Sequence, residues 1–233
     1  MPVDNAIEAS ALGKRYRRRW ALADCTLTVP AGQVVGLVGP NGAGKTTLLE
    51  LAVGLLRPTT GTIRLRRRAG FVAQGAPVYA DLSVADHLRM GQGLSARWDA
   101  RLAWRRVEEA GLDPRQRAGR LSGGQRAQLA LTLAVARRPE LLVLDEPAAN
   151  LDPLARHDFL DSVTRAVTAS GQGMTVVFSS HLVADLERTC GYLILLAGGQ
   201  VRLAGQVDTL LAADNHARSL DDLVVSCLRE AAR

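Results

Sequence analysis

The octapeptide Gly39–Thr46, with the sequence Gly-Pro-Asn-Gly-Ala-Gly-Lys-Thr, constrains the fold of this chain more than any other segment. It matches GxxxxGK[ST], a pattern in which glycines let the backbone curl until its N–H groups point at phosphate oxygens. The apolar run Val34–Val38 precedes it, and a helical pattern over Lys45–Val53 follows it. This strand–loop–helix order predicts a phosphate-binding loop within an α/β domain.

The side chains of this loop suit a nucleoside triphosphate. Lys45 offers a compact positive charge to the β and γ phosphates, where the broad guanidinium of arginine would fit poorly. The chain has 29 basic residues, of which only Lys14 and Lys45 are lysines, so a lysine here indicates a role that arginine cannot fill. The Thr46 hydroxyl is a candidate ligand of Mg²⁺. The expected nucleotide-binding residues of the loop are Gly39, Pro40, Asn41, Gly42, Ala43, Gly44, Lys45, Thr46 and Thr47.

Two carboxylates follow the apolar run Leu141–Leu144. A strand that ends there would put Asp145 at the carboxyl edge of a sheet, where ligands of open α/β sheets bind. Asp145 is the expected ligand of Mg²⁺, and Glu146 is the expected base that orients or deprotonates an attacking water. The alternative is that Asp145 is only a helix N-cap and Glu146 a solvated side chain.

The segment Leu121–Gln125, with the sequence Leu-Ser-Gly-Gly-Gln, predicts a second anion site. Ser122 is a candidate helix N-cap, and Gly123 and Gly124 would leave backbone N–H groups uncovered at the helix start. Two phosphate-binding helix starts can serve one nucleotide most simply if two chains pair head to tail. The alternative is an ordinary glycine-capped helix. The expected contacts here are Ser122, Gly123, Gly124 and Gln125.

At 233 residues the chain has the length of one compact domain. Candidate strands and helices alternate along it, which predicts an α/β fold with a largely parallel central sheet. From Ser83 onward, Leu88, Leu94, Leu102 and Val107 recur at helical spacing with arginines between them. This change of pattern predicts an inserted helical segment.

Together these motifs resemble the nucleotide-binding subunit of ATP-binding cassette (ABC) transporters, over about Ile7–Gly205. The resemblance implies a P-loop NTPase fold with a mostly parallel central sheet, an N-terminal antiparallel β subdomain and an inserted α-helical subdomain. It implies a single ABC ATPase domain over residues 1–233. The expected parts are a core at about 1–82 and 139–205, a helical signature subdomain at about 83–138, and a short helical tail at 206–233.

Further family positions are matched by residues of this chain. Gln74 matches a glutamine implied to touch Mg²⁺ or the water and to face the membrane partner. His181 matches a histidine implied to contact the γ phosphate, and Asp152 an aspartate implied to signal across the dimer. Tyr16 matches an aromatic residue that stacks on adenine, with Trp20 as the competing candidate. Without the resemblance, each would be interpreted as a surface, capping or core-packing residue.

The implied function is an ATP-hydrolysing motor that works with transmembrane permease subunits and with a second ABC ATPase subunit, identical or different. The segment 121–128 is similar to cassettes of antibiotic-responsive or drug exporters, which favours export. The alternative is a soluble ABC-type ATPase acting on nucleic acid or ribosomes. Lys45 and Asp145 are 100 residues apart with no sustained heptads, which argues against a long coiled-coil ATPase. A nucleotide kinase would explain Lys45 but not Leu121–Gln125.

Composition limits the setting. No apolar run reaches the ~18–20 residues of a membrane-spanning helix, and no secretory signal is visible. The three cysteines have neither zinc-site spacing nor a disulfide framework, which is typical of a reducing cytosol. We therefore expect a location at the cytoplasmic face of the membrane, peripheral through the permease. The net charge of +6 then suits anionic lipid headgroups, and without an aromatic-rich basic patch no nucleic-acid partner is expected.

Overall fold

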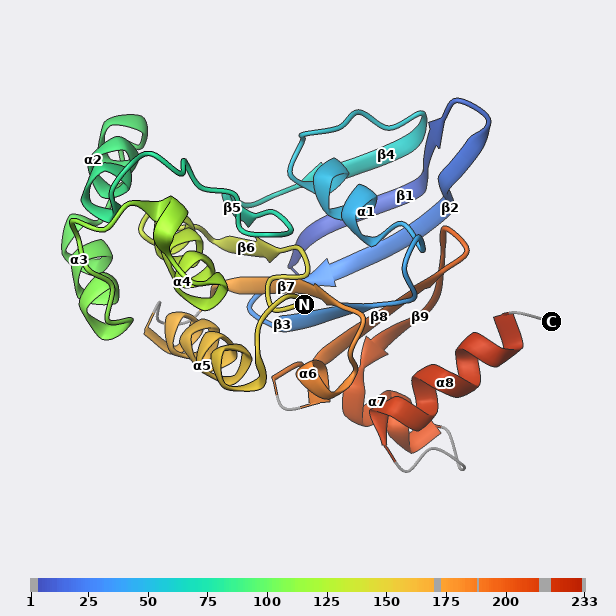
Figure 1. Ribbon diagram of the computed structural model, residues 1–233. Coiled ribbons are helices and arrows are strands. Elements are labelled where there is room, and N and C mark those ends of the chain that lie inside the picture. Colours follow the sequence, from blue (N-terminus) through green and yellow to red (C-terminus); the bar gives the residue numbers. More distant parts are fainter. Residues whose placement is uncertain (1–3, 170–172, 188, 214–218, 232–233) are drawn as a thin grey trace. The chain divides into compact units, whose positions relative to one another are not determined.

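The computed structural model describes residues 4–169, 173–187, 189–213 and 219–231 (Figure 1). Contacts between backbone positions divide the chain into two units. The first contains residues 1–68 and 175–233, and the second contains Ala69–Met174. Each unit is built from local sequence patterns that can be followed separately.

The first unit begins with an antiparallel sheet of three strands. These are β1 (Asn5–Tyr16), β2 (Arg19–Pro30) and β4 (Thr60–Leu65), in the order β2-β1-β4. The sequence predicts short strands at 6–9 and 22–29. Both are confirmed, but β1 and β2 each run to 12 residues. Their tight connection contains Arg17 at φ 53°, a left-handed conformation that usually calls for glycine. The sequence therefore lacks an ordinary turn signal at this point.

A second set of strands in this unit has the order β7-β3-β8-β9. Strand β3 (Val34–Val38) is parallel to β7 (Thr175–Ser180) and β8 (Tyr192–Ala197), and β9 (Gln200–Gln206) is antiparallel to β8. The interiors of the three parallel strands are buried and almost continuously apolar, as expected where both faces of a parallel sheet are covered. The sequence predicts a hairpin whose strands flank the turn at Gly198 and Gly199, and the antiparallel pair β8–β9 confirms it.

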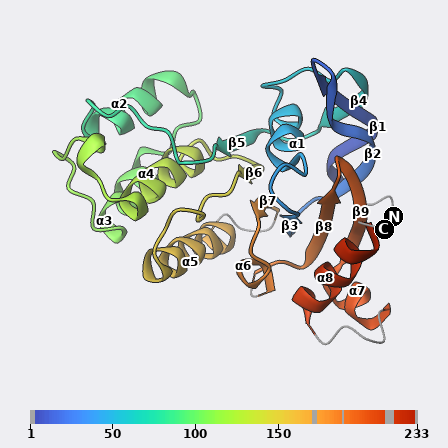
Figure 2. The ribbon, with the colours of Figure 1, turned by 45° about the vertical axis from the view of Figure 1, so that its right-hand side comes forward.

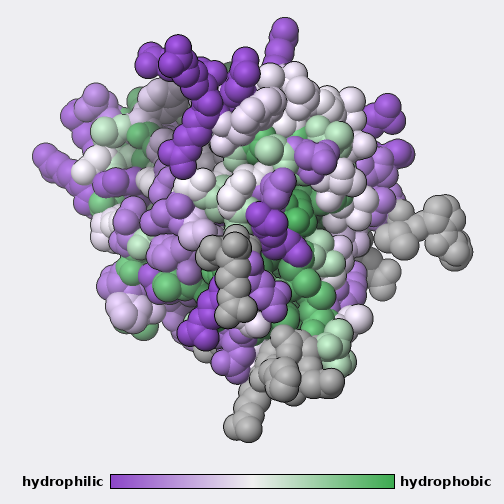
Figure 3. Space-filling view, turned by 90° about the vertical axis from the view of Figure 1, so that its right-hand side faces the viewer, coloured by the Kyte–Doolittle hydropathy of each residue, from purple (hydrophilic) through white to green (hydrophobic). Residues whose placement is uncertain are grey.

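Helices complete the first unit (Figure 2). They are α1 (Lys45–Ala52), α6 (Ala184–Glu187), α7 (Val207–Ala213) and α8 (Leu220–Ala231). Helix α8 buries Leu223 and Val224 and exposes Asp221 and Asp222, and it contacts β8 and β9. Helices α7 and α8 lie within the tail expected at 206–233, whose bounds stay a prediction. Figure 3 shows hydrophilic and hydrophobic residues mixed on one face of the molecule. The sequence predicts a short helix over 182–188. Helix α6 lies within this range, and residue 188 lies outside the described residues.

The second unit contains a parallel strand pair and four longer helices. The pair is β5 (Ala69–Val72) with β6 (Leu141–Leu144), and β6 has the bounds that the sequence predicts. The helices are α2 (Val84–Leu94), α3 (Ala100–Glu109), α4 (Gly123–Val135) and α5 (Pro153–Ala169), with a short 3-10 turn at Ala118–Arg120.

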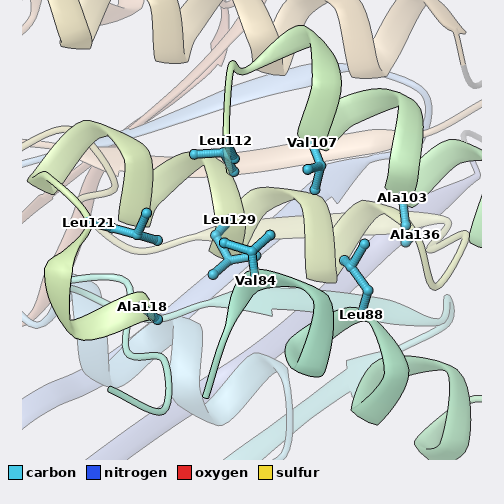
Figure 4. Packing of buried hydrophobic residues seen from close by; sticks show 9 residues of the cluster. All are labelled: Val84, Leu88, Ala103, Val107, Leu112, Ala118, Leu121, Leu129 and Ala136. Atoms are coloured by element: carbon cyan, nitrogen blue, oxygen red, sulfur yellow. The ribbon is translucent and has the colours of Figure 1, made fainter. Parts of the chain in front are cut away.

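Helices α2, α3 and α4 pack around an apolar cluster (Figure 4). Val84 and Leu88 come from α2, Val107 from α3 and Leu129 from α4, and all four are almost fully buried. Burying one such side chain contributes roughly 1.5–3 kcal/mol, so the cluster suffices to hold the helices together. Leu94 does not join it. It is 77% exposed because α2 ends at this residue.

The described strands and helices confirm an α/β fold with mostly parallel strands and a separate antiparallel sheet. The subdomain boundaries expected from the resemblance stay a prediction. Among the helices of the described residues, none combines the length and the apolar character needed to span a bilayer.

Candidate nucleotide-binding site

The glycine-rich loop joins β3 to α1 and encloses the side chain of Lys45. This side chain is only 5% exposed. Its ammonium donates hydrogen bonds to the carbonyl oxygens of Gly39, at 2.7 Å, and Pro40, at 3.3 Å. The positive charge is therefore fixed inside the loop at the N-terminus of α1. This is the location where helix N–H groups and the helix dipole also favour an anion.

Two glycines of the loop are required by close packing as well as by phosphate binding. A Cβ atom at Gly39 would overlap the carbonyl group of Leu196 on β8. A Cβ atom at Gly44 would lie 2.5 Å from the carbonyl oxygen of Ala21 on β2, and Gly44 has φ 105°. The loop thus packs closely against the backbone of β8 and β2, and the sequence did not indicate these contacts. No motif marks Leu196 or Ala21, because they contribute only their carbonyl groups.

His181 follows β7 at the same end of the sheet as the loop. Ser180 pairs with Val38 in parallel register, so Gly39 and His181 leave neighbouring strands at a common carboxyl edge. The Ser180 hydroxyl accepts a hydrogen bond from the Leu182 N–H at 3.0 Å and donates one to Asp185 at 3.1 Å. These bonds fix the turn that carries His181, which is exposed.

Tyr16 and Trp20 lie at the end of the β1–β2 hairpin. They are 46% and 42% exposed, which excludes simple core packing for both rings. The Lys14 ammonium lies 5.4 Å from the Tyr16 ring centroid, and the Arg15 guanidinium 5.6 Å from that of Trp20. Each ring is thus partly exposed and has a cation over its face.

In the second unit, Gln74, Asp145 and Glu146 follow the carboxyl ends of the paired strands β5 and β6. The Asp145 N–H donates to the Val72 carbonyl oxygen at 2.9 Å, and the Asp145 residue is 1% exposed. Gln74 comes two residues after Val72 and is exposed. Asp145 does not begin a helix, so the N-cap alternative is wrong for it. Glu146 has φ 42°, a left-handed conformation uncommon outside glycine and often found at functional sites.

The predicted helix start at Ser122 is confirmed. The Ser122 hydroxyl accepts a hydrogen bond from the Gln125 N–H at 3.2 Å, and Oε1 of Gln125 accepts one from the Ser122 N–H at 3.0 Å. This reciprocal capping box fixes the first turn of α4. A Cβ atom at Gly124 would lie 2.9 Å from the Cβ atom of Ala155 on α5, so the glycine also permits close packing of the two helices.

Asp152 caps the next helix. Its Oδ1 accepts hydrogen bonds from the N–H groups of Leu154, at 3.1 Å, and Ala155, at 3.0 Å. The N-cap alternative is therefore correct for Asp152, without excluding a second role. A cavity of about 440 Å³ lies beside both helix starts and includes Ser122, Gly124 and Gln125 in its lining.

The structure thus gathers the expected residues into two groups. The loop, His181 and Tyr16 belong to the first unit, and Gln74, Asp145, Glu146, Ser122 and Asp152 belong to the second. Parallel strands that end at a common edge explain why the loop groups with His181, and why Gln74 groups with Asp145 and Glu146.

A lysine-bearing glycine loop between a strand and a helix, with an aspartate ending a parallel strand, defines a P-loop NTPase fold. The ABC transporter family matches residues 22–149, and this chain belongs to that family as an ATP-binding domain. The resemblance seen in the sequence is thereby confirmed.

Individual relatives cover most of the chain. An uncharacterised ABC transporter ATP-binding protein of Bacillus subtilis is 33% identical over 216 residues, which are 88% of this chain and 72% of the relative. Nod factor export ATP-binding protein I of Cupriavidus pinatubonensis is 36% identical over 222 residues, 88% of this chain and 67% of the relative. A solved ATP-binding subunit of an ABC transporter has a TM-score of 0.83 at 29% identity, covering 96% of this chain and 99% of that one.

Proposed function

We propose that this chain is the ATP-hydrolysing motor subunit of an ABC membrane transporter and works with separate transmembrane permease subunits. The observation that carries the proposal is the buried Lys45 ammonium, hydrogen-bonded inside the glycine loop at the start of α1. A desolvated cation at a helix N-terminus is suited to phosphate oxygens. We assign the triphosphate to residues 39–47 and the adenine ring to Tyr16.

The assigned metal ligands fit Mg²⁺ together with its substrate. Thr46, Gln74 and Asp145 offer a hydroxyl, an amide and a carboxylate, all oxygen donors. The described residues contain no group of three or more His, Cys, Asp or Glu side chains that could hold a metal alone. Mg²⁺ commonly takes only one or two carboxylates and completes its shell with substrate phosphates and water. When bound, the ion neutralises charge on the β and γ phosphates.

Hydrolysis is assigned to Glu146, Gln74 and His181. Glu146 would accept a proton from the attacking water, Gln74 would orient that water, and His181 would donate a hydrogen bond to the γ phosphate. The left-handed backbone of Glu146 supports a functional role, because such a conformation has an energetic cost in a non-glycine residue.

A head-to-tail dimer gives the second anion site a role. Ser122, Gly123, Gly124 and Gln125, with Asp152, would close the ATP site of a partner subunit. Their support is the capped start of α4, which leaves unpaired N–H groups available to a γ phosphate. Binding energy from that phosphate would drive closure, and hydrolysis would release it.

The direction of transport that we propose is export. Its support is the similarity to Nod factor export ATP-binding proteins, although an energy-coupling factor transporter ATP-binding protein of Symbiobacterium thermophilum is also 34% identical over 210 residues. We propose a location at the cytoplasmic face of the membrane, with the exposed Gln74 facing the permease. The core, helical and tail boundaries expected from the sequence are part of this proposal.

Crosslinking of two engineered cysteines tests the dimer. Asn41→Cys and Arg120→Cys place thiols at exposed positions near the loop and near Ser122. The background is Glu146→Gln, to preserve bound ATP, and Cys227→Ser, because Cys25 and Cys190 are buried whereas Cys227 is partly exposed. We expect an intermolecular disulfide when the two chains, each with one engineered cysteine, are mixed with ATP. An equal yield without nucleotide, or no disulfide although both chains bind ATP, would exclude the arrangement.

A further inference from the structure

A cavity of about 790 Å³ lies between α3, the end of α4 and the second half of α5, outside all of the nucleotide-binding motifs. Figures 1 and 2 both show these three helices as neighbours within the second unit. Part of the wall is apolar, from Leu102, Val135, Pro139, Ala166 and Met174. The charged side chains of the wall are Arg105, Arg106, Arg138, Arg165 and Glu109.

Arg106 is the unusual member of this wall. Its position on α3 continues the inward-facing stripe of Leu102, Ala103 and Val107, so the residue is only 7% exposed. Its Nε atom is buried without a hydrogen-bond partner among the described residues. Burying a cation is costly unless hydrogen-bond acceptors or an anion compensate its charge, so the buried Nε–H favours a ligand that supplies an acceptor.

The nearby carboxylates are engaged elsewhere. Glu109 pairs with Arg105 at 3.8 Å, and Asp99 accepts a hydrogen bond from Arg138 Nε at 3.0 Å. Arg165 donates to the Ser162 hydroxyl at 2.9 Å, which carries no charge.

Burial lowers the pKa of Arg106. Glu109 opposes this shift, while Arg165 and Arg105 add to it by repulsion. The wall contains four arginines and one glutamate, so Arg106 and Arg165 lie in a cavity with an excess of positive charge.

We infer that this cavity binds a small organic anion. Its acidic group would lie between Arg106 and Arg165, and its apolar part would contact Leu102, Val135 and Met174. Guanidinium groups bind carboxylates, sulfonates and phosphates through paired N–H groups. The volume falls within the ~300–1,000 Å³ range of small-molecule pockets, and an apolar wall with few polar groups is their usual composition. The inference does not depend on the proposed ATPase function.

Two fluorescent dyes with the same apolar skeleton test the inference. 8-Anilinonaphthalene-1-sulfonate carries an anionic group, and N-phenyl-1-naphthylamine lacks it. We expect the full chain to bind the sulfonate at least ~10-fold more tightly than the neutral dye, since hydrogen bonds between charged groups are the stronger kind. Arg106→Met should remove this preference. Arg101→Met is the matched control, because Arg101 is an exposed arginine on the same helix outside the cavity wall.

Thermal unfolding distinguishes a ligand site from a structural arginine. Without dye, Arg106→Met should unfold at the same temperature as the original chain or higher, because replacing a buried unpaired cation by an apolar side chain is commonly neutral or stabilising. Arg165→Met should also weaken the preference, and it changes a residue outside the buried stripe. An unchanged dye preference in both variants, failure of the original chain to bind the sulfonate, or a lower unfolding temperature of Arg106→Met would overturn the inference.

Discussion

The Lys45 ammonium and the Gly39 carbonyl oxygen lie 2.7 Å apart, so the loop holds its own cation before any phosphate arrives. This contact leads to the first prediction, which compares the two lysines of the chain. Lys45→Arg keeps the charge but introduces a planar guanidinium into a space that suits an ammonium group. We expect ATP affinity to fall at least ~10-fold, a loss of about 1.4 kcal/mol, and turnover to disappear, as in Lys45→Ala.

Lys14→Arg is the control for this substitution. Lys14 donates to the Arg57 carbonyl oxygen from an exposed position, where a guanidinium can replace the ammonium. Equilibrium binding of a fluorescent ATP analogue and phosphate release measure both variants. Full activity of Lys45→Arg would contradict the geometric argument.

Glu146→Gln separates ATP binding from hydrolysis. The amide keeps the shape of the side chain and loses the basic carboxylate, so phosphate release should fall by ~10²-fold or more while ATP still binds. An ATP-dependent dimer should accumulate in size-exclusion chromatography. Glu108→Gln, an exposed position on α3, is the control and should keep normal turnover. Near-normal turnover of Glu146→Gln would show that another group is the base.

The two capping boxes of the second unit allow a matched comparison. Ser122 caps α4 with Gln125, and Ser83 caps α2 with Asp86 in the same reciprocal geometry. Ser122→Ala and Ser83→Ala should each lower the free energy of unfolding by ~1 kcal/mol in urea titrations. Only Ser122→Ala should also reduce ATP turnover. Equal turnover of the two variants would remove Ser122 from the proposed site.

The buried thiol of Cys190 leads us to predict that the free energy of unfolding decreases at alkaline pH. Burial raises the pKa of its thiol to about 12 from the ordinary value of 9.0, so the unfolded chain releases the proton first. Stability from this group is complete below pH 9 and decreases as the pH rises toward 12, by at most ~1.4 kcal/mol per pH unit. Urea unfolding of the original chain and of Cys190→Ala between pH 8 and 11 measures how the free energy of unfolding depends on pH. Parallel pH profiles of the two proteins would contradict the assignment.

Sequence reasoning succeeded where local pattern and tertiary packing agree. The loop at Gly39–Thr46 predicts both the strand before it and the helix after it. The run Leu141–Leu144 is apolar at every position, and its ends match β6 without adjustment. The caps at Ser122 and Asp152 are equally local, because each depends on residues within three positions.

The features of the fold and site that the sequence did not predict depend on contacts between segments that are distant in the sequence. The requirement for glycine at position 39 comes partly from Leu196, and that at position 44 from Ala21. The turn at Arg17 has no glycine, so the length of β1 and β2 was not evident. Arg106 occupies an inward-facing position of α3, but its residue type suggests a solvent-exposed side chain. Only the packing of α3 against α4 reveals that it is buried.

Helices α4 and α5 each begin at a capped residue that we assign to the dimer seam, and each reaches the Arg106 cavity near its other end. At a rise of 1.5 Å per residue, α4 and α5 are about 20 and 25 Å long. The cavity thus adjoins both helices at the end opposite the proposed dimer seam. An anion that binds one tilt of the helices more tightly than another would change ATP affinity, and ATP would change the affinity for that anion by the same factor. The concentration of a small acid in the cell would in this way change the ATP concentration at which the proposed dimer closes.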